Sequence, residues 1–122
     1  MKRIEYKVVV NECGDKLWYL NDWLHREDGP AVEHANGNKL WYLNGELHRE
    51  DGPAIEYASG TKYWYLDGKL HREDGPAIEW ADGDKSWYIN DKQVTKSEVM
   101  KTIDIDGKKF TLAQIKAALA KA

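Results

Sequence analysis

The chain has 122 residues, a formal net charge of −3 and one cysteine, Cys13. This length suits a single domain with a modest core, and the charge excludes the bulk basic field typical of nucleic-acid-binding proteins. One cysteine excludes an internal disulfide. The sequence contains no apolar run of membrane-spanning length and no signal-peptide core near Met1, so we expect a cytoplasmic protein.

A repeat of 23 residues organises most of the chain. The octapeptide Leu-His-Arg-Glu-Asp-Gly-Pro-Ala is identical in three copies that begin at Leu24, Leu47 and Leu70. A fixed period of this size indicates stacked supersecondary units, none of which buries its own face alone. The predicted units are a half repeat at 4–14, repeats at 14–36, 37–59 and 60–82, and a degenerate repeat at 83–94.

Each unit is predicted to form two antiparallel strands. Segments rich in aromatic and β-branched residues lie between turn-forming dipeptides. Asn44-Gly45 and Asp67-Gly68 predict two-residue hairpin turns, because both central residues of such turns adopt positive φ. We expect the first of these turns to pair Tyr42 with Leu47. The other turn is assigned the same length, at Asn36-Gly37, Ser59-Gly60 and Asp82-Gly83.

The two-residue turns require a break inside the octapeptide. A turn at 59–60 pairs Ala54 with Tyr65, whereas strict alternation from Leu47 would place Ala54 on the opposite face. A bulge or tight turn at Glu50–Pro53 and in its two copies resolves the conflict. Glycine tolerates left-handed geometry there, and proline cannot donate to a central ladder.

The segment 95–122 is predicted to cap the sheet with a helix, a hairpin and a second helix. Thr95 with Glu98 and Thr111 with Gln114 match the capping-box pattern. The hairpin turns at Asp106-Gly107. The final helix carries an apolar stripe of Leu112, Ile115, Ala118 and Leu119. The predicted fold is mainly β, an antiparallel hairpin meander with a C-terminal α-helical cap over an end or face of the sheet.

The pattern Trp-Tyr-x-Asn-Gly-x-x-His, at residues 41–48, resembles MORN repeats. The sequence of the whole repeat is similar to MORN-variant repeats of bacterial antitoxin-like proteins and to repeat proteins of bacteriophages and giant viruses. The similarity covers about residues 6–94. It implies an extended β-sheet that binds or scaffolds, with no shared enzymatic reaction. MORN units usually continue His-Gly-x-Gly, where this chain has Arg-Glu-Asp-Gly-Pro-Ala, so lipid binding does not carry over.

The octapeptides predict ladders of identical side chains roughly 10 Å apart. The candidate binding residues in them are His25, His48, His71, Arg26, Arg49 and Arg72. The arginines either bind phosphates or carboxylates of a partner or pair with acids of their own or the adjacent repeat. The histidines either bind a ligand or stack on the paired tryptophan. Side chains roughly 10 Å apart cannot bind one metal ion together, and the carboxylates of a ladder do not face each other across one substrate. We therefore expect no metal, no cofactor and no catalysis.

A second candidate surface is a row of aromatic and basic residues. Two-residue turns would place each aromatic or imidazole ring opposite a lysine, where cation–π attraction is available. The predicted pairs are His34–Lys39, Tyr57–Lys62 and Trp80–Lys85. They either grip a partner or stabilise a narrow sheet.

Three functions follow from these patterns. The first is a non-catalytic scaffold that binds a protein partner through the repeat sheet; the viral resemblance implies a phage accessory factor that inhibits a host defence process in the host cytoplasm. The second is capture of an anionic nucleotide by the Arg and His ladders, and the third is a structural homo-oligomer. An exposed, unpaired arginine ladder would favour ligand capture, and arginines paired within the chain would count against it.

Overall fold

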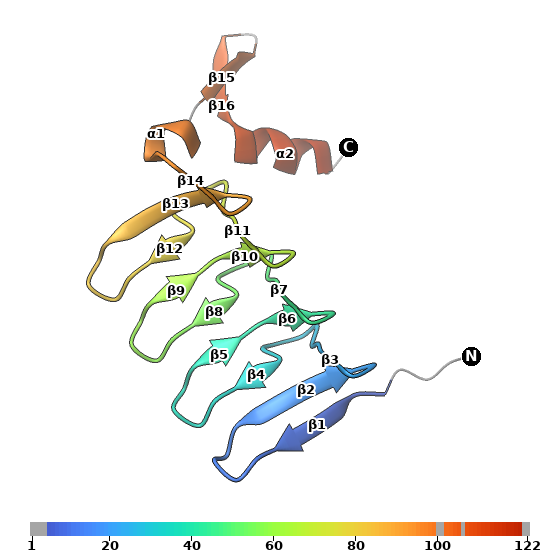
Figure 1. The fold of residues 1–122 in the computed structure, drawn as a ribbon. Coiled ribbons are helices and arrows are strands. Elements are labelled where there is room, and N and C mark those ends of the chain that lie inside the picture. The colour runs from blue at the N-terminus through green and yellow to red at the C-terminus, as the bar shows by residue number, and fades with distance from the viewer. Residues whose placement is uncertain (1–4, 100–101, 106, 121–122) are drawn as a thin grey trace.

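The computed structural model describes residues 5–99, 102–105 and 107–120, and it shows a file of β-hairpins that ends in a small helical unit (Figure 1). In chain order the elements are β1 (Lys7–Val10), β2 (Lys16–Leu20), β3 (Trp23–Leu24), β4 (Val32–Glu33), β5 (Lys39–Leu40), β6 (Tyr42–Leu43), β7 (Glu46–Leu47), β8 (Ile55–Glu56), β9 (Lys62–Tyr63), β10 (Tyr65–Leu66), β11 (Lys69–Leu70), β12 (Ile78–Glu79), β13 (Lys85–Ile89), β14 (Lys92–Val94), α1 (Lys96–Val99), β15 (Thr102–Ile105), β16 (Lys108–Thr111) and α2 (Leu112–Ala120).

One antiparallel sheet of ten strands runs the length of the array. Its order is β1-β2-β4-β5-β8-β9-β12-β13-β14, with β3 paired to β2. The hairpins β6-β7 and β10-β11 form separate two-stranded sheets, and they lie in a second row beside the main sheet (Figure 1). The predicted fold class, a β-hairpin meander with a C-terminal helix, is confirmed.

Trp41 marks the point at which the chain passes from the main sheet to the hairpin row. Its amide donates to the carbonyl of Ala54 at 2.7 Å, on the sheet side. Its carbonyl accepts from the amide of His48 at 3.0 Å, on the hairpin side. Trp64 makes both bonds in the next repeat. Each of these tryptophans therefore joins two short strands that have different partners.

The hairpin turns have the predicted geometry. Asn44 and Gly45 adopt φ values of 51° and 79°, and Tyr42 pairs with Leu47. Positive φ at both central residues is typical of the type I′ turn, whose twist matches that of the flanking strands. Asp67-Gly68 has the same geometry in the next repeat.

The turns at the other edge have three residues instead of two. Val32 pairs with Leu40, and the amide of His34 donates to the carbonyl of Asn38 at 2.9 Å. The glycine of the turn lies in the left-handed region, as a three-residue hairpin loop requires. The predicted register at this turn is therefore wrong by one residue.

The shift separates the predicted aromatic–basic pairs. Lys62 lies opposite Glu56, one residue before Tyr57, and the amide of Tyr57 donates to the carbonyl of Thr61 at 3.0 Å. Each lysine thus faces a carboxylate, and each ring lies one position nearer the turn. The pairs His34–Lys39, Tyr57–Lys62 and Trp80–Lys85 are wrong.

The predicted break inside the octapeptide is present, for a different reason. The chain bends at residues 50–52 and has no strand between β7 and β8. A two-residue turn would pair Ala54 with Tyr65, but the amide of Ala54 donates to the carbonyl of Tyr63 at 2.8 Å. Gly52 is not among the residues with positive φ. Its role is steric, because a side chain there would meet the guanidinium of Arg49.

The core is a thin row of small and β-branched side chains under the octapeptide loops (residues 24–31, 47–54 and 70–77). The alanine that ends each octapeptide has no exposed surface, and the next residue is also buried. These core residues are Ala31, Val32, Ala54, Ile55, Ala77 and Ile78. Small side chains here let the loops pack closely on the sheet.

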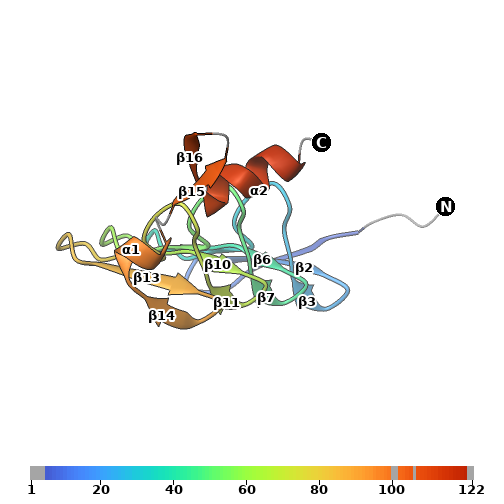
Figure 2. The ribbon, with the colours of Figure 1, turned by 90° about the horizontal axis from the view of Figure 1, so that it is seen from above.

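The C-terminal unit begins with the predicted capping boxes. The amide of Glu98 donates to Oγ1 of Thr95, and that of Gln114 donates to Oγ1 of Thr111, both at 3.2 Å. Strands β15 and β16 form the predicted hairpin, whose turn residue 106 lies outside the described residues. Leu119, at the end of the predicted apolar stripe, is 69% exposed. Helix α2 lies on the side of the octapeptide loops (Figure 2).

Candidate functional site

The guanidinium of Arg49 contacts four groups of its own repeat. Its Cζ lies 3.9 Å from the centroid of the Trp41 ring. Its Nε donates to Asp51 at 3.1 Å, and its Nη1 donates to the carbonyl of Pro53 at 3.1 Å. The same Nη1 pairs with Glu56 at 3.3 Å. The arrangement joins both ends of the loop to the sheet.

The other two arginines repeat this arrangement. Arg26 stacks on Trp18 and Arg72 on Trp64, each with 4.0 Å between Cζ and the ring centroid. All three arginine side chains are 23% exposed and paired with aspartate. The structure therefore favours the interpretation in which the arginines pair within the chain, which counts against their use as an anion-binding ladder.

The glycine of each octapeptide makes room for the stacked arginine. A Cβ at Gly52 would lie 2.9 Å from Cζ of Arg49. The corresponding distances are 3.0 Å at Gly29 and 2.7 Å at Gly75. The guanidinium thus lies between an indole ring and a bare Cα, which explains why glycine occurs without positive φ.

Each histidine joins its repeat to the next one. Nδ1 of His48 accepts from the amide of Asp67, the first residue of the next hairpin turn, at 3.0 Å. His25 and His71 accept in the same way from Asn44 and Asn90, at 2.9 and 3.0 Å. A ring that accepts at Nδ1 carries its proton on Nε2. The expected stacking of histidine on tryptophan is wrong, because arginine occupies that position.

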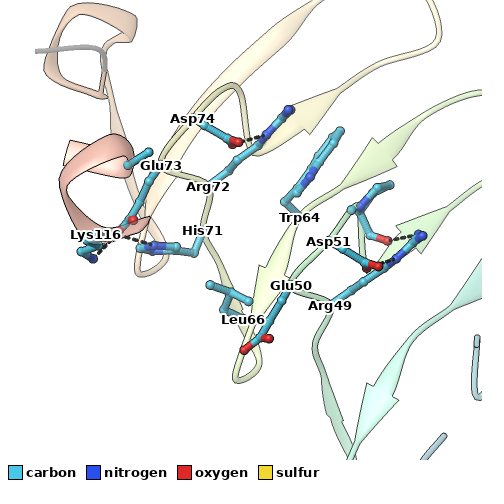
Figure 3. A pocket seen from close by; sticks show the side chains of 13 residues that line it. Arg49, Glu50, Asp51, Trp64, Leu66, His71, Arg72, Glu73, Asp74 and Lys116 are labelled. Carbon is cyan, nitrogen blue, oxygen red and sulfur yellow. Dashed lines mark hydrogen bonds and ion pairs between the residues drawn. The ribbon is translucent and has the colours of Figure 1, made fainter. Parts of the chain in front are cut away.

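The Nε2 atoms of the histidines point toward the glutamate two residues on. The separation from Nε2 to Oε1 is 3.6 Å for His25–Glu27, 3.6 Å for His48–Glu50 and 3.2 Å for His71–Glu73. In the third copy, Nζ of Lys116 from α2 also binds the carboxylate of Glu73 (Figure 3).

Two similar cavities lie between successive octapeptide loops. One, of about 670 Å³, lies between the first two loops and is lined by Trp41, Leu43 and His48. The other, of about 700 Å³, is lined by the equivalent Trp64, Leu66 and His71, and also by Ala113 and Lys116 of α2 (Figure 3). The repeat thus produces the same concave surface twice.

Exposed carboxylates surround these cavities. The side chains of Glu50 and Asp51 are 84% and 88% exposed; Asp51 is the partner of Arg49, whereas Glu50 pairs with no lysine or arginine among the described residues. The exposed acids of the three loops are Glu27, Asp28, Glu50, Asp51 and Asp74. A cationic partner is therefore favoured over an anionic one on this face.

The second predicted surface lies apart from the cavities. Tyr57 and Trp80 are 39% and 36% exposed and precede the three-residue turns. Tyr57 packs edge-on against Tyr63, with 5.8 Å between the ring centroids. Lys62 and Lys85 are exposed beside glutamates. These residues do not join the histidines and arginines in one site.

Lys116 and the glutamates Glu27, Glu50 and Glu73 are not among the candidate site residues predicted from the sequence. Lys116 lies 43 residues from Glu73 and outside the repeat. The glutamates recur in every octapeptide, but the pattern does not distinguish them from the aspartates that pair with arginine. Only the loop conformation separates the two acids.

Comparisons of the chain with protein-family models, with curated proteins and with solved structures found no match. Within residues 5–99, 102–105 and 107–120, no three His, Cys, Asp or Glu side chains are arranged to hold a metal ion. None of the helices described is long and apolar enough to cross a membrane.

Proposed function

We propose that the chain is a non-catalytic interaction protein that binds a protein partner along the row of octapeptide loops. The pair of equivalent cavities, of about 670 and 700 Å³, carries this proposal. Each combines an indole and a leucine side chain with an acidic rim. Interfaces draw most of their binding energy from aromatic anchors in such concave sites.

The charge distribution supports a protein partner over an anionic nucleotide. The guanidiniums that would bind phosphate are stacked and paired with carboxylates, as for Arg49 with Asp51. The exposed acids of the rim would repel a nucleotide and attract a basic protein surface. Nucleotide capture therefore has less support.

The biological setting is proposed from the resemblance of the repeats. MORN-like repeats of similar sequence occur in bacteriophages and giant viruses, where a small rigid array would serve as an accessory factor. We therefore propose that the partner is a host protein in the host cytoplasm, and that binding inhibits a host defence process.

A structural homo-oligomer is a second candidate because of the free edge of β1. Val8 and Val10 are 49% and 61% exposed on this terminal strand of the sheet. A free edge with apolar side chains is a template for pairing with a second copy. Analytical ultracentrifugation of the wild type and of Val8→Lys tests this candidate. The wild type should sediment with the mass of a dimer, and Val8→Lys with the mass of a monomer.

The test is affinity capture from a host lysate followed by native mass spectrometry. Leu43→Ala with Leu66→Ala removes an apolar side chain from each cavity, and Tyr57→Ala with Trp80→Ala is the matched control away from them. We expect a captured protein that the first variant loses and the control keeps. Retention by the cavity variant, loss by the control, or a nucleotide as the sole bound species would contradict the proposal.

A further inference from the structure

The three octapeptide loops hold the same His–Glu pair in two different states. In the third copy Glu73 is 18% exposed, and its Oε1 lies 3.2 Å from Nε2 of His71. In the first two copies the glutamates are 76% and 84% exposed, and the same separation is 3.6 Å. Among the residues that the structure describes, the feature peculiar to the third copy is a lysine or arginine side chain, Lys116, on the carboxylate.

The occupied copy shows how the site works. The amide of Asn90 donates to Nδ1 of His71, which leaves the proton on Nε2. That N–H points at Oε1 of Glu73, which also accepts from Nζ of Lys116 (Figure 3). The histidine therefore orients the carboxylate, and the carboxylate binds the ammonium group.

In the first copy the histidine, His25, is buried at 5% exposure, and its Nε2 makes no hydrogen bond within the described residues. A buried N–H without an acceptor is costly. A cation that drew Glu27 inward, as Lys116 draws Glu73, would supply the acceptor.

We propose that each His–Glu pair binds a cationic side chain, that Lys116 fills the third copy from within the chain, and that the Glu27 and Glu50 copies take Lys or Arg side chains of a basic segment in the protein partner. This inference rests on the proposed function and names the chemistry of its partner. Two strands per repeat separate the copies by roughly 10 Å. A segment in the polyproline II conformation spans about this distance in one turn of three residues, so its side chains three positions apart point to the same side. Cations at every third position would therefore match the two open sites.

The probe is a fluorescent peptide of about ten residues with lysine at every third position, titrated against the full chain at low salt. We expect Glu27→Gln with Glu50→Gln to weaken binding about tenfold or more, because both open sites lose their charge. Glu5→Gln with Glu12→Gln is the matched control: it removes the same charge from exposed positions outside the loops and should leave the affinity within about twofold.

Lys116→Gln provides a test with the opposite sign. It frees Glu73 as a third site, so peptide affinity should rise about threefold or more. Lys92→Gln, an exposed lysine on β14, makes the same change in net charge and should not raise affinity. A peptide with the lysines adjacent to one another should bind more weakly than the spaced peptide.

Three results would overturn the inference: no binding of the spaced peptide, an equal loss in the Glu5/Glu12 control, or no gain from Lys116→Gln. If the peptide fails but lysate capture still depends on Leu43 and Leu66, the inference fails and the proposed function stands. If both assays fail, neither survives.

Discussion

The guanidinium of Arg49 stacks on the indole of Trp41, with 3.9 Å between Cζ and the ring centroid. Trp41 is the residue at which the chain leaves the main sheet, and Arg49 lies in the loop that returns to it. The stack therefore anchors the loop on the sheet, and the ion pair with Asp51 balances the charge of the arginine. The adjacent Glu50 is the acid of the loop that Arg49 does not bind.

Arg49→Ala should lower the free energy of unfolding by about 1–3 kcal/mol, because it removes the stack and leaves the carbonyl of Pro53 without its donor. Arg49→Lys should recover little of this loss, since an ammonium cannot reproduce the planar fork. Urea denaturation measures both. Lys69→Ala, at an exposed position on β11, should stay within about 0.5 kcal/mol of the wild type.

Gly52→Ala should destabilise the protein by about 1–3 kcal/mol, because the new Cβ would meet Cζ of Arg49 at 2.9 Å. The cost should shrink in an Arg49→Ala background, where the obstructing guanidinium is gone. A double-mutant cycle measures this coupling. Equal costs in the two backgrounds would show that the backbone itself, and not the arginine, requires glycine.

His48→Ala should cost about 1–2 kcal/mol, because the amide of Asp67 loses its acceptor between repeats. His48→Asn should cost less, since its Oδ1 can accept near the position of Nδ1. Hydrogen exchange at the Asp67 amide reports the bond directly. Protection of that amide in His48→Ala equal to that in the wild type would contradict the inter-repeat role.

Acid should weaken the first repeat through Asp15. The Ala35 amide and the Asn11 side chain donate to its carboxylate and lower the pKa of Asp15 below its usual value. A lowered folded-state pKa means that this contribution is full above the unfolded pKa, near 3.9, and is lost as the pH falls through the folded value.

Asp15→Asn should therefore lose less stability than the wild type below about pH 4. At neutral pH its amide oxygen should still accept from the amide of Ala35. Asn38 shows that an amide serves at the equivalent position, because its Oδ1 accepts from the amide of Ala58 at 2.8 Å. Urea titrations between acidic and neutral pH measure the slope. An unchanged acid slope in Asp15→Asn would assign the pH dependence to other carboxylates.

Asp22→Gly should stabilise the chain by about 1 kcal/mol, because Asp22 holds a φ of 68° that glycine adopts without strain. Asp91 is the matched comparison with the same φ, but its Oδ1 accepts from the amide of Leu70 at 2.7 Å. Asp91→Gly should therefore gain nothing. Thermal unfolding of both variants separates the effect of backbone strain from that of the hydrogen bond. A higher melting temperature in both variants would show that the bond from the Leu70 amide to Asp91 contributes little to stability.

The sequence alone determined the repeat and its two-residue hairpin turns. The 23-residue period and Asn44-Gly45 are local signals, because the preference for positive φ belongs to those residues themselves. The capping boxes at Thr95 and Thr111 were predictable for the same reason: the side chain bonds an amide three residues away.

Tertiary structure decided the register at 35–37 and the roles of the charges. An Asn-Gly pair suits both two- and three-residue loops, and the pairing of Val32 with Leu40 shows that the longer one formed. The acids of the octapeptide are equivalent in the sequence until the bend brings Asp51 to Nε of Arg49 and Glu50 near Nε2 of His48. The contact of Lys116 with Glu73 joins residues 43 positions apart, and no local preference encodes such a contact because only packing of the helix beside the loops creates it.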